Sequence, residues 1–181
     1  MDSLLPQAYL IGLIVLLGGA AVVVARQIWL VRGDEVTLAR LEVESANTAS
    51  AQASQLYELA SVQLRKRLYD QALDSLKLAA KRADADGEPS EARALIQNAL
   101  GFALAAKNNY KTAIRHYRQA LADKPDYPVA LNNLAFALEK QQKFDEAEAA
   151  YQTVLGLDAN NKTAQKRLKL LERKAGARNV A

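Results

Sequence analysis

Two neighbouring stretches decide the fold: IQNALGFALAAKNNYKTAIRHYRQALADKPD at residues 96–126 and LNNLAFALEKQQKFDEAEAAYQTVLGLDAN at residues 131–160. In each stretch, apolar residues recur at helical spacing, an aromatic residue follows a short polar turn, and a second helical pattern then begins. The small residues Ala113 and Ala147 take the same place in the two stretches and lie 34 residues apart. Two helices that repeat with this period predict an all-α solenoid of stacked hairpins.

An earlier stretch, LYELASVQLRKRLYDQALDSLKLAAK at residues 56–81, is a third copy of the pattern. Its small residue, Ala72, lies 41 residues before the one in the second copy, which is seven more than the period. Gly87 and Pro89 interrupt the helical pattern between these two copies. The excess therefore predicts a longer connection at residues 83–92.

Small and large residues also pair at matching places in the first helix of each copy. A leucine precedes a small residue at Leu59-Ala60, Leu100-Gly101 and Leu134-Ala135. This pattern resembles the tetratricopeptide repeat family, whose unit is a pair of antiparallel helices. The resemblance covers residues 53–174 and implies repeats at about 53–86, 94–127 and 128–161.

The residues that follow the third copy carry an apolar stripe, Ala164, Leu168 and Leu171, and a polar opposite face. This pattern predicts a capping helix at residues 161–174, followed by a flexible tail at 175–181. The segment is also basic, which fits either a contact with anionic lipid or an acidic partner, or a solvated face of the cap.

The N-terminal segment, residues 3–25, contains no charged side chain. As a helix, its 23 residues are roughly 34 Å long, enough to cross a bilayer core of about 30 Å. A cleaved signal peptide is the alternative, but the acidic start and the long apolar run favour a permanent anchor. We expect an integral membrane protein with a single span, an anchor at residues 1–32 and a helical or partly ordered linker at 33–52. Because Arg26 and Arg32 follow the span, we expect the repeats on the cytoplasmic or stromal side.

In the tetratricopeptide family the first helix of each repeat lines a concave face. The resemblance therefore implies a groove lined by Tyr57, Ser61, Asn98, Phe102, Asn132 and Phe136, with Arg65 and Lys140 near its rim. Asparagine offers donors and acceptors to a peptide backbone, and phenylalanine offers apolar area. We expect a peptide segment of a protein partner in this groove. The alternative is that the phenylalanines are buried within the domain.

Catalytic and metal chemistry lacks its usual residues. The chain has no cysteine and one histidine, His116, which we expect on the surface. There is no GKS or GKT phosphate-binding motif, and no carboxylate has a base or a metal ligand as companion. We therefore expect a protein that is not an enzyme and has no cofactor, no metal and no small-molecule substrate. The net charge of +4 comes without a nucleic-acid-binding motif, so nucleic acid is not an expected partner.

Two phrases, LYELASVQLRKRLYDQAL and KPDYPVALNNLAFALEK, resemble the photosystem I assembly-associated tetratricopeptide proteins of cyanobacteria and plastids. The order of span, linker and three repeats is similar over essentially the whole chain. The resemblance implies a thylakoid-membrane scaffold that binds photosystem I subunits or assembly intermediates. Two other hypotheses stay open: a general membrane-tethered adaptor in envelope biogenesis, and an accessory subunit of a membrane enzyme.

Overall fold

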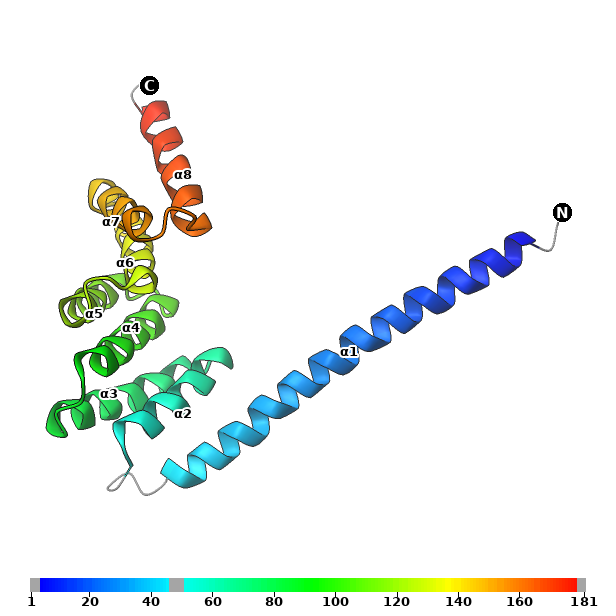
Figure 1. Ribbon diagram of the computed structural model, residues 1–181, viewed down its shortest axis with the longest axis horizontal. Coiled ribbons are helices and arrows are strands. Elements are labelled where there is room, and N and C mark those ends of the chain that lie inside the picture. The colour runs from blue at the N-terminus through cyan, green and yellow to red at the C-terminus, as the bar shows by residue number, and fades with distance from the viewer. Residues whose placement is uncertain (1–3, 46–50, 179–181) are drawn as a thin grey trace.

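The computed structural model describes residues 4–45 and 51–178, which form helices joined by short turns (Figure 1). The helices are α1 Leu4–Ser45, α2 Ala53–Arg65, α3 Tyr69–Ala85, α4 Ser90–Ala106, α5 Tyr110–Asp123, α6 Pro128–Lys140, α7 Phe144–Leu157 and α8 Lys162–Arg178. No strand occurs in the described ranges, and the all-α prediction is confirmed.

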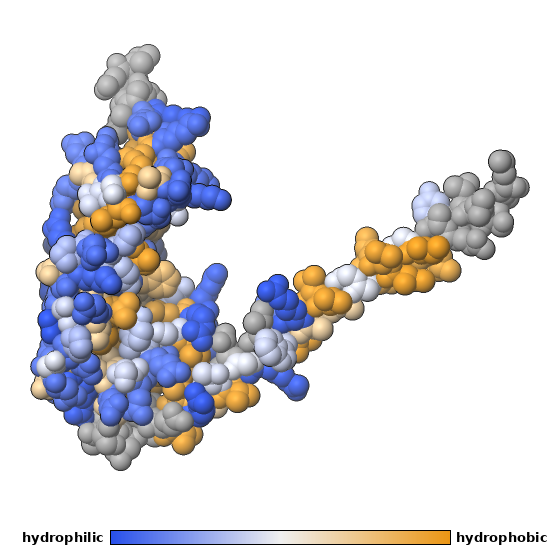
Figure 2. All heavy atoms as spheres, in the orientation of Figure 1, coloured by the Kyte–Doolittle hydropathy of each residue, from blue (hydrophilic) through white to orange (hydrophobic). Residues whose placement is uncertain are grey.

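Three hairpins, α2–α3, α4–α5 and α6–α7, stack one on another, and α8 closes the far end. Their first helices lie on the side of the stack toward α1, and their second helices lie on the other side (Figure 1). Figure 2 shows that the stack is hollowed on the side toward α1. The predicted solenoid of hairpins with its concave side of first helices is therefore present.

The three hairpins turn in the same way. Arg67, Asn108 and Gln142, the corresponding residues of the turns, have φ of 60°, 62° and 61°. In each turn the next N–H group donates to the carbonyl five residues earlier, as from Leu68 to Gln63 at 2.9 Å. This is the Schellman arrangement, which satisfies the last carbonyls of a helix. The helix after each turn starts at an aromatic residue.

The prediction of a longer connection at 83–92 is wrong, because most of that segment is helical. The turn between α3 and α4 spans residues 86–89, as short as the turn at 124–127 between α5 and α6. Instead, α3 is three residues longer than α5 and α4 is four residues longer than α6, which accounts for all seven extra residues. Alanine and charged residues extend a helix readily, and only Gly87, at φ 65°, and Pro89 break it.

The N-terminal helix does not end where the apolar segment ends. Helix α1 runs unbroken for 42 residues, through the first part of the expected linker; the linker residues 46–50 lie outside the described residues. Near its end, Leu38 and Leu41 pack against Leu59 and Val62 of α2. Glu35 also forms an ion pair with Lys66. The end of α1 thus covers the edge of α2 that no preceding hairpin covers.

At the other end, α8 packs on the third hairpin through buried Ala164 and Leu171. The side chain of Asn161 caps its first turn, with Oδ1 accepting from the Ala164 N–H at 3.1 Å. The helix continues to Arg178, so the expected flexible tail is helical over residues 175–178. Residues 179–181 of that expected tail lie outside the described residues.

Candidate partner-binding groove

The groove side of the stack exposes a few large apolar side chains. Phe102 of α4 is 44% exposed, and Leu95, two turns earlier on the same helix, is 41% exposed. Val129, at the start of α6, is 53% exposed. The groove predicted from the sequence includes Phe102 but neither Leu95 nor Val129. Each lies one helical turn before a named asparagine, and that spacing could have identified them.

The centre of the groove holds a polar cluster that joins neighbouring repeats. Asn133 Nδ2 donates to Asn98 Oδ1 at 3.0 Å, and Asn98 Nδ2 donates to Tyr127 Oη at 3.4 Å. Burial, and then the nearby hydroxyl of Tyr57, raise the pKa of Tyr127, so its phenol is neutral at physiological pH. The amide of Asn98 thus connects α4 to α6 in addition to lying on the groove side.

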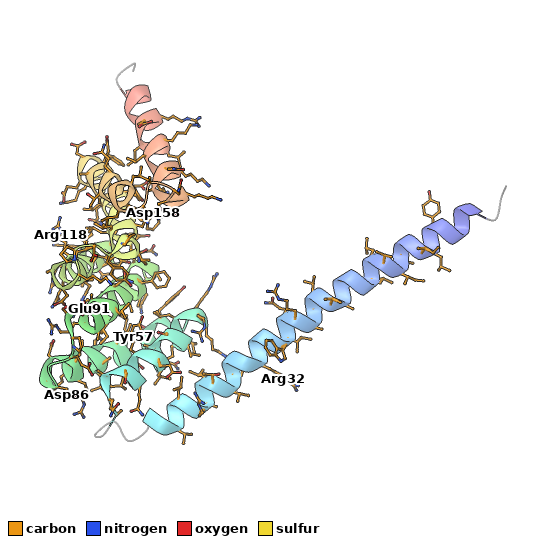
Figure 3. The ribbon with its side chains drawn as sticks, viewed as in Figure 1. Arg32, Tyr57, Asp86, Glu91, Arg118 and Asp158 are labelled. Carbon is orange, nitrogen blue, oxygen red and sulfur yellow. The ribbon has the colours of Figure 1, made fainter. Side chains whose placement is uncertain are left out.

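The first repeat contributes a small pocket. Tyr57 lies on α2 (Figure 3). Together with Ala53 and Ser54 of α2 and Leu95 and Ile96 of α4, it lines a space of about 170 Å³. Glu88 and Ala92 complete its lining. An apolar side chain of a partner fits such a space.

The two remaining groove residues of α2 are engaged by their own helix. Ser61 Oγ donates to the Tyr57 carbonyl at 2.8 Å. The Arg65 guanidinium lies at the exposed end of α2 and donates to the Ser61 carbonyl at 3.4 Å. The hydroxyl of Ser61 is therefore a weaker candidate for binding than the ring of Tyr57.

The far end of the groove is built from α6, α5 and α8. The Phe136 ring meets the Tyr110 ring edge-on, with the centroids 6.4 Å apart. The Lys140 ammonium and the Arg167 guanidinium lie 5.3 and 4.9 Å from the Phe136 centroid. Arg167 also pairs with Glu139 at 3.7 Å. Phe136 is thus half-buried among groups of the domain itself, whereas Phe102 at the same repeat position is open.

Asn132 joins α6 to the start of the cap. Its Nδ2 donates to Asn161 Oδ1 at 3.3 Å, the same oxygen that caps α8. Its own Oδ1 is buried and has no hydrogen-bond partner among the described residues. The Nδ2 of Asn132 therefore helps to hold the capping helix in place, whereas its Oδ1 is an acceptor without a donor among the described residues.

His116 is not a surface residue as expected. It is half-buried between α5 and α4, and its Nδ1 lies 2.8 Å from Gln97 Oε1. Burial, and then the charge of Arg115, lower the pKa of its imidazole. Within the described ranges, no group of three or more His, Cys, Asp or Glu side chains could hold a metal ion.

The chain is similar to known proteins in sequence and in fold. The tetratricopeptide repeat family matches residues 104–171. The chain is 33% identical over 171 residues to the uncharacterized protein ycf37 of Guillardia theta, and the match covers 94% of each chain. The chain belongs to the ycf37 family of tetratricopeptide repeat proteins.

A second relative is the tetratricopeptide repeat domain-containing protein PYG7, chloroplastic, of Arabidopsis thaliana. It is 32% identical over 160 residues, which cover 88% of this chain and 52% of PYG7. A ycf37 protein of Cyanophora paradoxa is 35% identical over 114 residues, covering 63% of this chain and 64% of the relative. One of these relatives, PYG7, is thus named as a chloroplast protein.

Solved structures share the fold. The crystal structure of MamA superposes with a TM-score of 0.69 at 19% identity, covering 81% of each chain. The first tetratricopeptide domain of Spaghetti (RPAP3), bound to an HSP90 peptide, superposes with a TM-score of 0.62 at 24% identity, covering 69% of this chain and 94% of that one. The chain therefore shares the tetratricopeptide solenoid fold with these structures.

Proposed function

We propose that this chain is a membrane-anchored scaffold that binds a segment of a photosystem I subunit or assembly intermediate in its groove. The observation that carries the proposal is the continuity of α1. One helix contains the apolar segment Tyr9–Trp29 and, without a break, the residues that pack on α2. The groove opens toward the side on which α1 runs (Figure 2). Such an arrangement presents the groove to segments that emerge from the same membrane.

The membrane anchor rests on length and composition. Tyr9–Trp29 has 21 residues, about 32 Å of helix, and none of them is buried against the rest of the chain. A helix satisfies its own backbone hydrogen bonds, so it can cross the hydrocarbon core. Arg26 and Arg32 follow at the C-terminal side, which favours the cytoplasmic or stromal face for the repeats.

The partner class rests on the chemistry of the groove. Open apolar side chains, Phe102 and Leu95, lie beside amides and a phenol that can hydrogen-bond a peptide backbone. Such a combination of apolar area and hydrogen-bonding groups suits a protein segment. A thylakoid location and photosystem I follow from the resemblance of the two quoted phrases and agree with the chloroplastic relative.

The first test is an affinity purification of the tagged full-length chain from its native membranes in a gentle detergent. Mass spectrometry is expected to recover photosystem I subunits, enriched in incomplete complexes and substoichiometric to the mature one. Recovery of unrelated envelope proteins alone would leave a general membrane-tethered adaptor. Constant stoichiometry with one mature membrane enzyme would instead identify an accessory subunit.

The second test separates the groove from the rest of the surface. Phe102→Ala removes an open aromatic ring from the groove, and Leu157→Ala removes a side chain of similar exposure, 48%, at the end of α7. We expect Phe102→Ala to reduce recovery of the partner roughly tenfold, as for an aromatic hot spot, at an unchanged melting temperature. Equal recovery with both variants would exclude the groove as the binding surface.

The predicted pair at the other end of the groove is tested as Asn132→Ala with Phe136→Ala. We expect partner recovery to fall while the far-ultraviolet circular dichroism stays that of a helical protein. Unfolding of this double variant would make the pair structural, in keeping with the contacts of Phe136 to Tyr110 and of Asn132 to Asn161. The Phe102→Ala result alone would then show whether the groove is the binding surface.

The anchor is tested by washing native membranes with alkaline carbonate. A protein held by a membrane-spanning helix stays in the pellet, whereas a peripheral protein is released. Release of the full-length chain would exclude the span while leaving the repeat fold intact.

A further inference from the structure

Four cations form one stripe along α8. Lys162, Lys166, Lys169 and Arg173 follow one another at intervals of four, three and four residues, which places them on one face of the helix. All four are exposed. The buried residues of α8, Ala164 and Leu171, lie on the opposite face. The stripe therefore points away from the hairpin on which α8 packs.

The charge of this stripe is not neutralised within the domain. Among the described residues, none of the four cations forms an ion pair. The acidic residue of α8 nearest to them in sequence, Glu172, lies a quarter turn away from the stripe. The neighbouring Arg167, off the stripe, is the one that pairs with Glu139.

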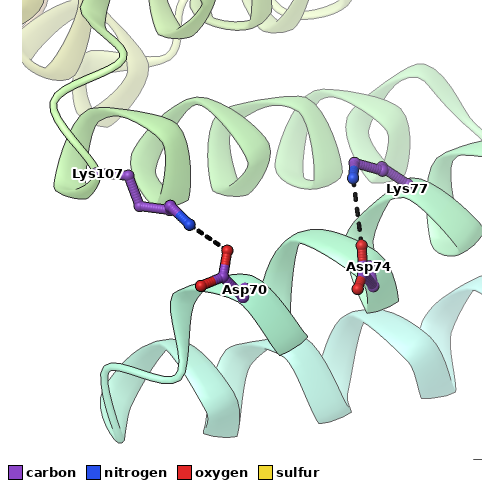
Figure 4. Close-up of polar contacts among 4 residues, drawn as sticks. All are labelled: Asp70, Asp74, Lys77 and Lys107. Atoms are coloured by element: carbon purple, nitrogen blue, oxygen red, sulfur yellow. Dashed lines mark hydrogen bonds and ion pairs between the residues drawn. The ribbon is translucent and has the colours of Figure 1, made fainter.

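Several cations elsewhere on the stack are paired. Lys107 pairs with Asp70 between the first two hairpins, and Lys77 pairs with Asp74 (Figure 4). Arg118, on the side away from α1, pairs with Glu146 at 2.7 Å (Figure 3). A like-charged row at helical spacing destabilises a helix, and Lys162 in the first turn opposes the helix dipole. Local costs of this kind are expected where a surface has a partner.

The position of the stripe relative to the span indicates which partner. Leu38 of α1, which packs against α2, lies nine positions after Trp29, the end of the apolar segment, and this is roughly 14 Å of helix. The stack is therefore held close to the membrane surface. Figure 2 shows hydrophilic side chains of α8 projecting toward the side on which α1 runs. Cations that lie near an anionic leaflet are attracted to its head groups.

We propose that the stripe of Lys162, Lys166, Lys169 and Arg173 binds anionic lipid head groups of the membrane that holds α1. This inference rests on the proposed membrane anchor. The stack then contacts the membrane at both ends, through α1 next to the first hairpin and through α8 after the third. The groove between these two contacts faces the membrane surface. A partner segment leaving the bilayer then enters the groove without a long linker.

The absence of cysteine from the chain makes the test direct. Gln165→Cys, beside the stripe, and Gln119→Cys, exposed on α5, each accept one environment-sensitive fluorophore. The labelled full-length protein is reconstituted into vesicles of phosphatidylcholine alone or with phosphatidylglycerol, each containing a lipid with a nitroxide head group. Quenching then reports the approach of each label to the membrane surface.

We expect the label at position 165 to be quenched severalfold more in phosphatidylglycerol vesicles than in phosphatidylcholine vesicles. High salt, about 1 M, should remove the difference, because the screening length falls to about 3 Å. Lys162→Gln with Lys166→Gln and Lys169→Gln should remove it too, at an unchanged melting temperature. The label at position 119 should show no dependence on the lipid.

Two results would overturn the inference: equal quenching at position 165 in both vesicles, or no quenching above that at position 119. Either would leave an acidic protein as the partner of the stripe. Flotation of the vesicles after a carbonate wash distinguishes the two proposals. Protein that floats with an unquenched label defeats the lipid contact alone, whereas protein that does not float defeats the anchor.

Discussion

The two halves of the stack have different cores. The N-terminal half, from α2 to α4, is filled by leucine, isoleucine and alanine, with no fully buried aromatic among the described residues. The C-terminal half, from α5 to α8, is built around the fully buried rings of Tyr117 and Tyr151. The match to the tetratricopeptide repeat family, residues 104–171, runs from the last turn of α4 through this second half.

The difference shows how one repeat array can serve two purposes. The C-terminal half is regular: its core continues without interruption into the cap α8. The N-terminal half has longer helices and a separate small cluster, where Leu38 and Leu41 hold α1 against α2. We infer that the second half supplies stability, and that the first half joins the stack to α1.

The largest difference in stability is expected when a buried leucine is replaced by alanine either in the C-terminal core or at the contact between α1 and α2. Leu171→Ala empties a buried site in the C-terminal core and should lower the free energy of unfolding by about 2–4 kcal/mol. Leu41→Ala, equally buried but in the small cluster, should leave the main unfolding transition nearly unchanged and free α1 instead. Chemical denaturation of both variants measures this. Equal losses from the two substitutions would mean that α1 belongs to the stable core.

The junction between the halves provides the next test. A methyl group on Gly101 would lie 2.5 Å from the Tyr117 ring, which is buried and cannot easily move away. Gly101→Ala should therefore destabilise the stack by about 1–3 kcal/mol. Gly156→Ala, where nothing lies within 4 Å, is the control and should be neutral or stabilising by up to about 1 kcal/mol. Thermal melts that show no difference between them would refute the close packing of α4 on α5.

The hairpin turns should respond alike in both halves. Arg67 and Gln142 hold a left-handed backbone conformation that is strained for side chains of this kind. Replacing either by glycine should stabilise the protein by up to about 1 kcal/mol, since the relief of strain exceeds the entropy gained by the unfolded chain. Asn108→Gly should change little, because asparagine tolerates this conformation. A loss of stability in all three variants would contradict the shared turn geometry.

The smallest effect concerns pH. Because the folded state lowers the pKa of His116 below its ordinary 6.5, the unfolded chain binds the proton more readily. Stability contributed by the neutral imidazole is therefore complete above about pH 6.5 and declines as the pH falls through that value. Melting temperatures measured between about pH 8 and pH 5.5 should fall less in His116→Gln than in the parent chain. Parallel curves would mean that the imidazole is not buried against α4.

The sequence predicted what depends on local pattern. The stack of hairpins and its capping helix were predicted from the period, from the aromatic residues that start the second helices, and from the small residues of each hairpin. The sequence could not predict where the seven extra residues go, because alanine and charged residues suit both a helix and a loop. Nor could it predict the docking of α1, since Leu38 and Leu41 find their partners on another helix.

The positions of the groove residues could be predicted from the sequence, but the contacts of their side chains could not. Phe102 and Phe136 take the same place in their repeats, yet only Phe136 is covered, by Tyr110 and Arg167 from other helices. Asn98 faces the groove side as expected, but its amide is engaged by Asn133 and Tyr127. The prediction that His116 lies on the surface was wrong for the same reason, because Gln97 of α4 contacts its imidazole. Such contacts depend on how the hairpins stack, which the pattern of one repeat does not contain.

The most direct test of the account asks whether α1 and the stack form one body. Arg32→Cys, on α1 between the apolar segment and the α2 contact, and Gln119→Cys, on α5, introduce two exposed labelling sites into a chain without cysteine. Spin labels at these sites, in full-length protein reconstituted into lipid nanodiscs, report their separation by double electron–electron resonance. We predict one narrow distance distribution, which Leu41→Ala broadens. A distribution already broad in the parent chain would contradict the account, because the groove would then have no fixed orientation toward the membrane.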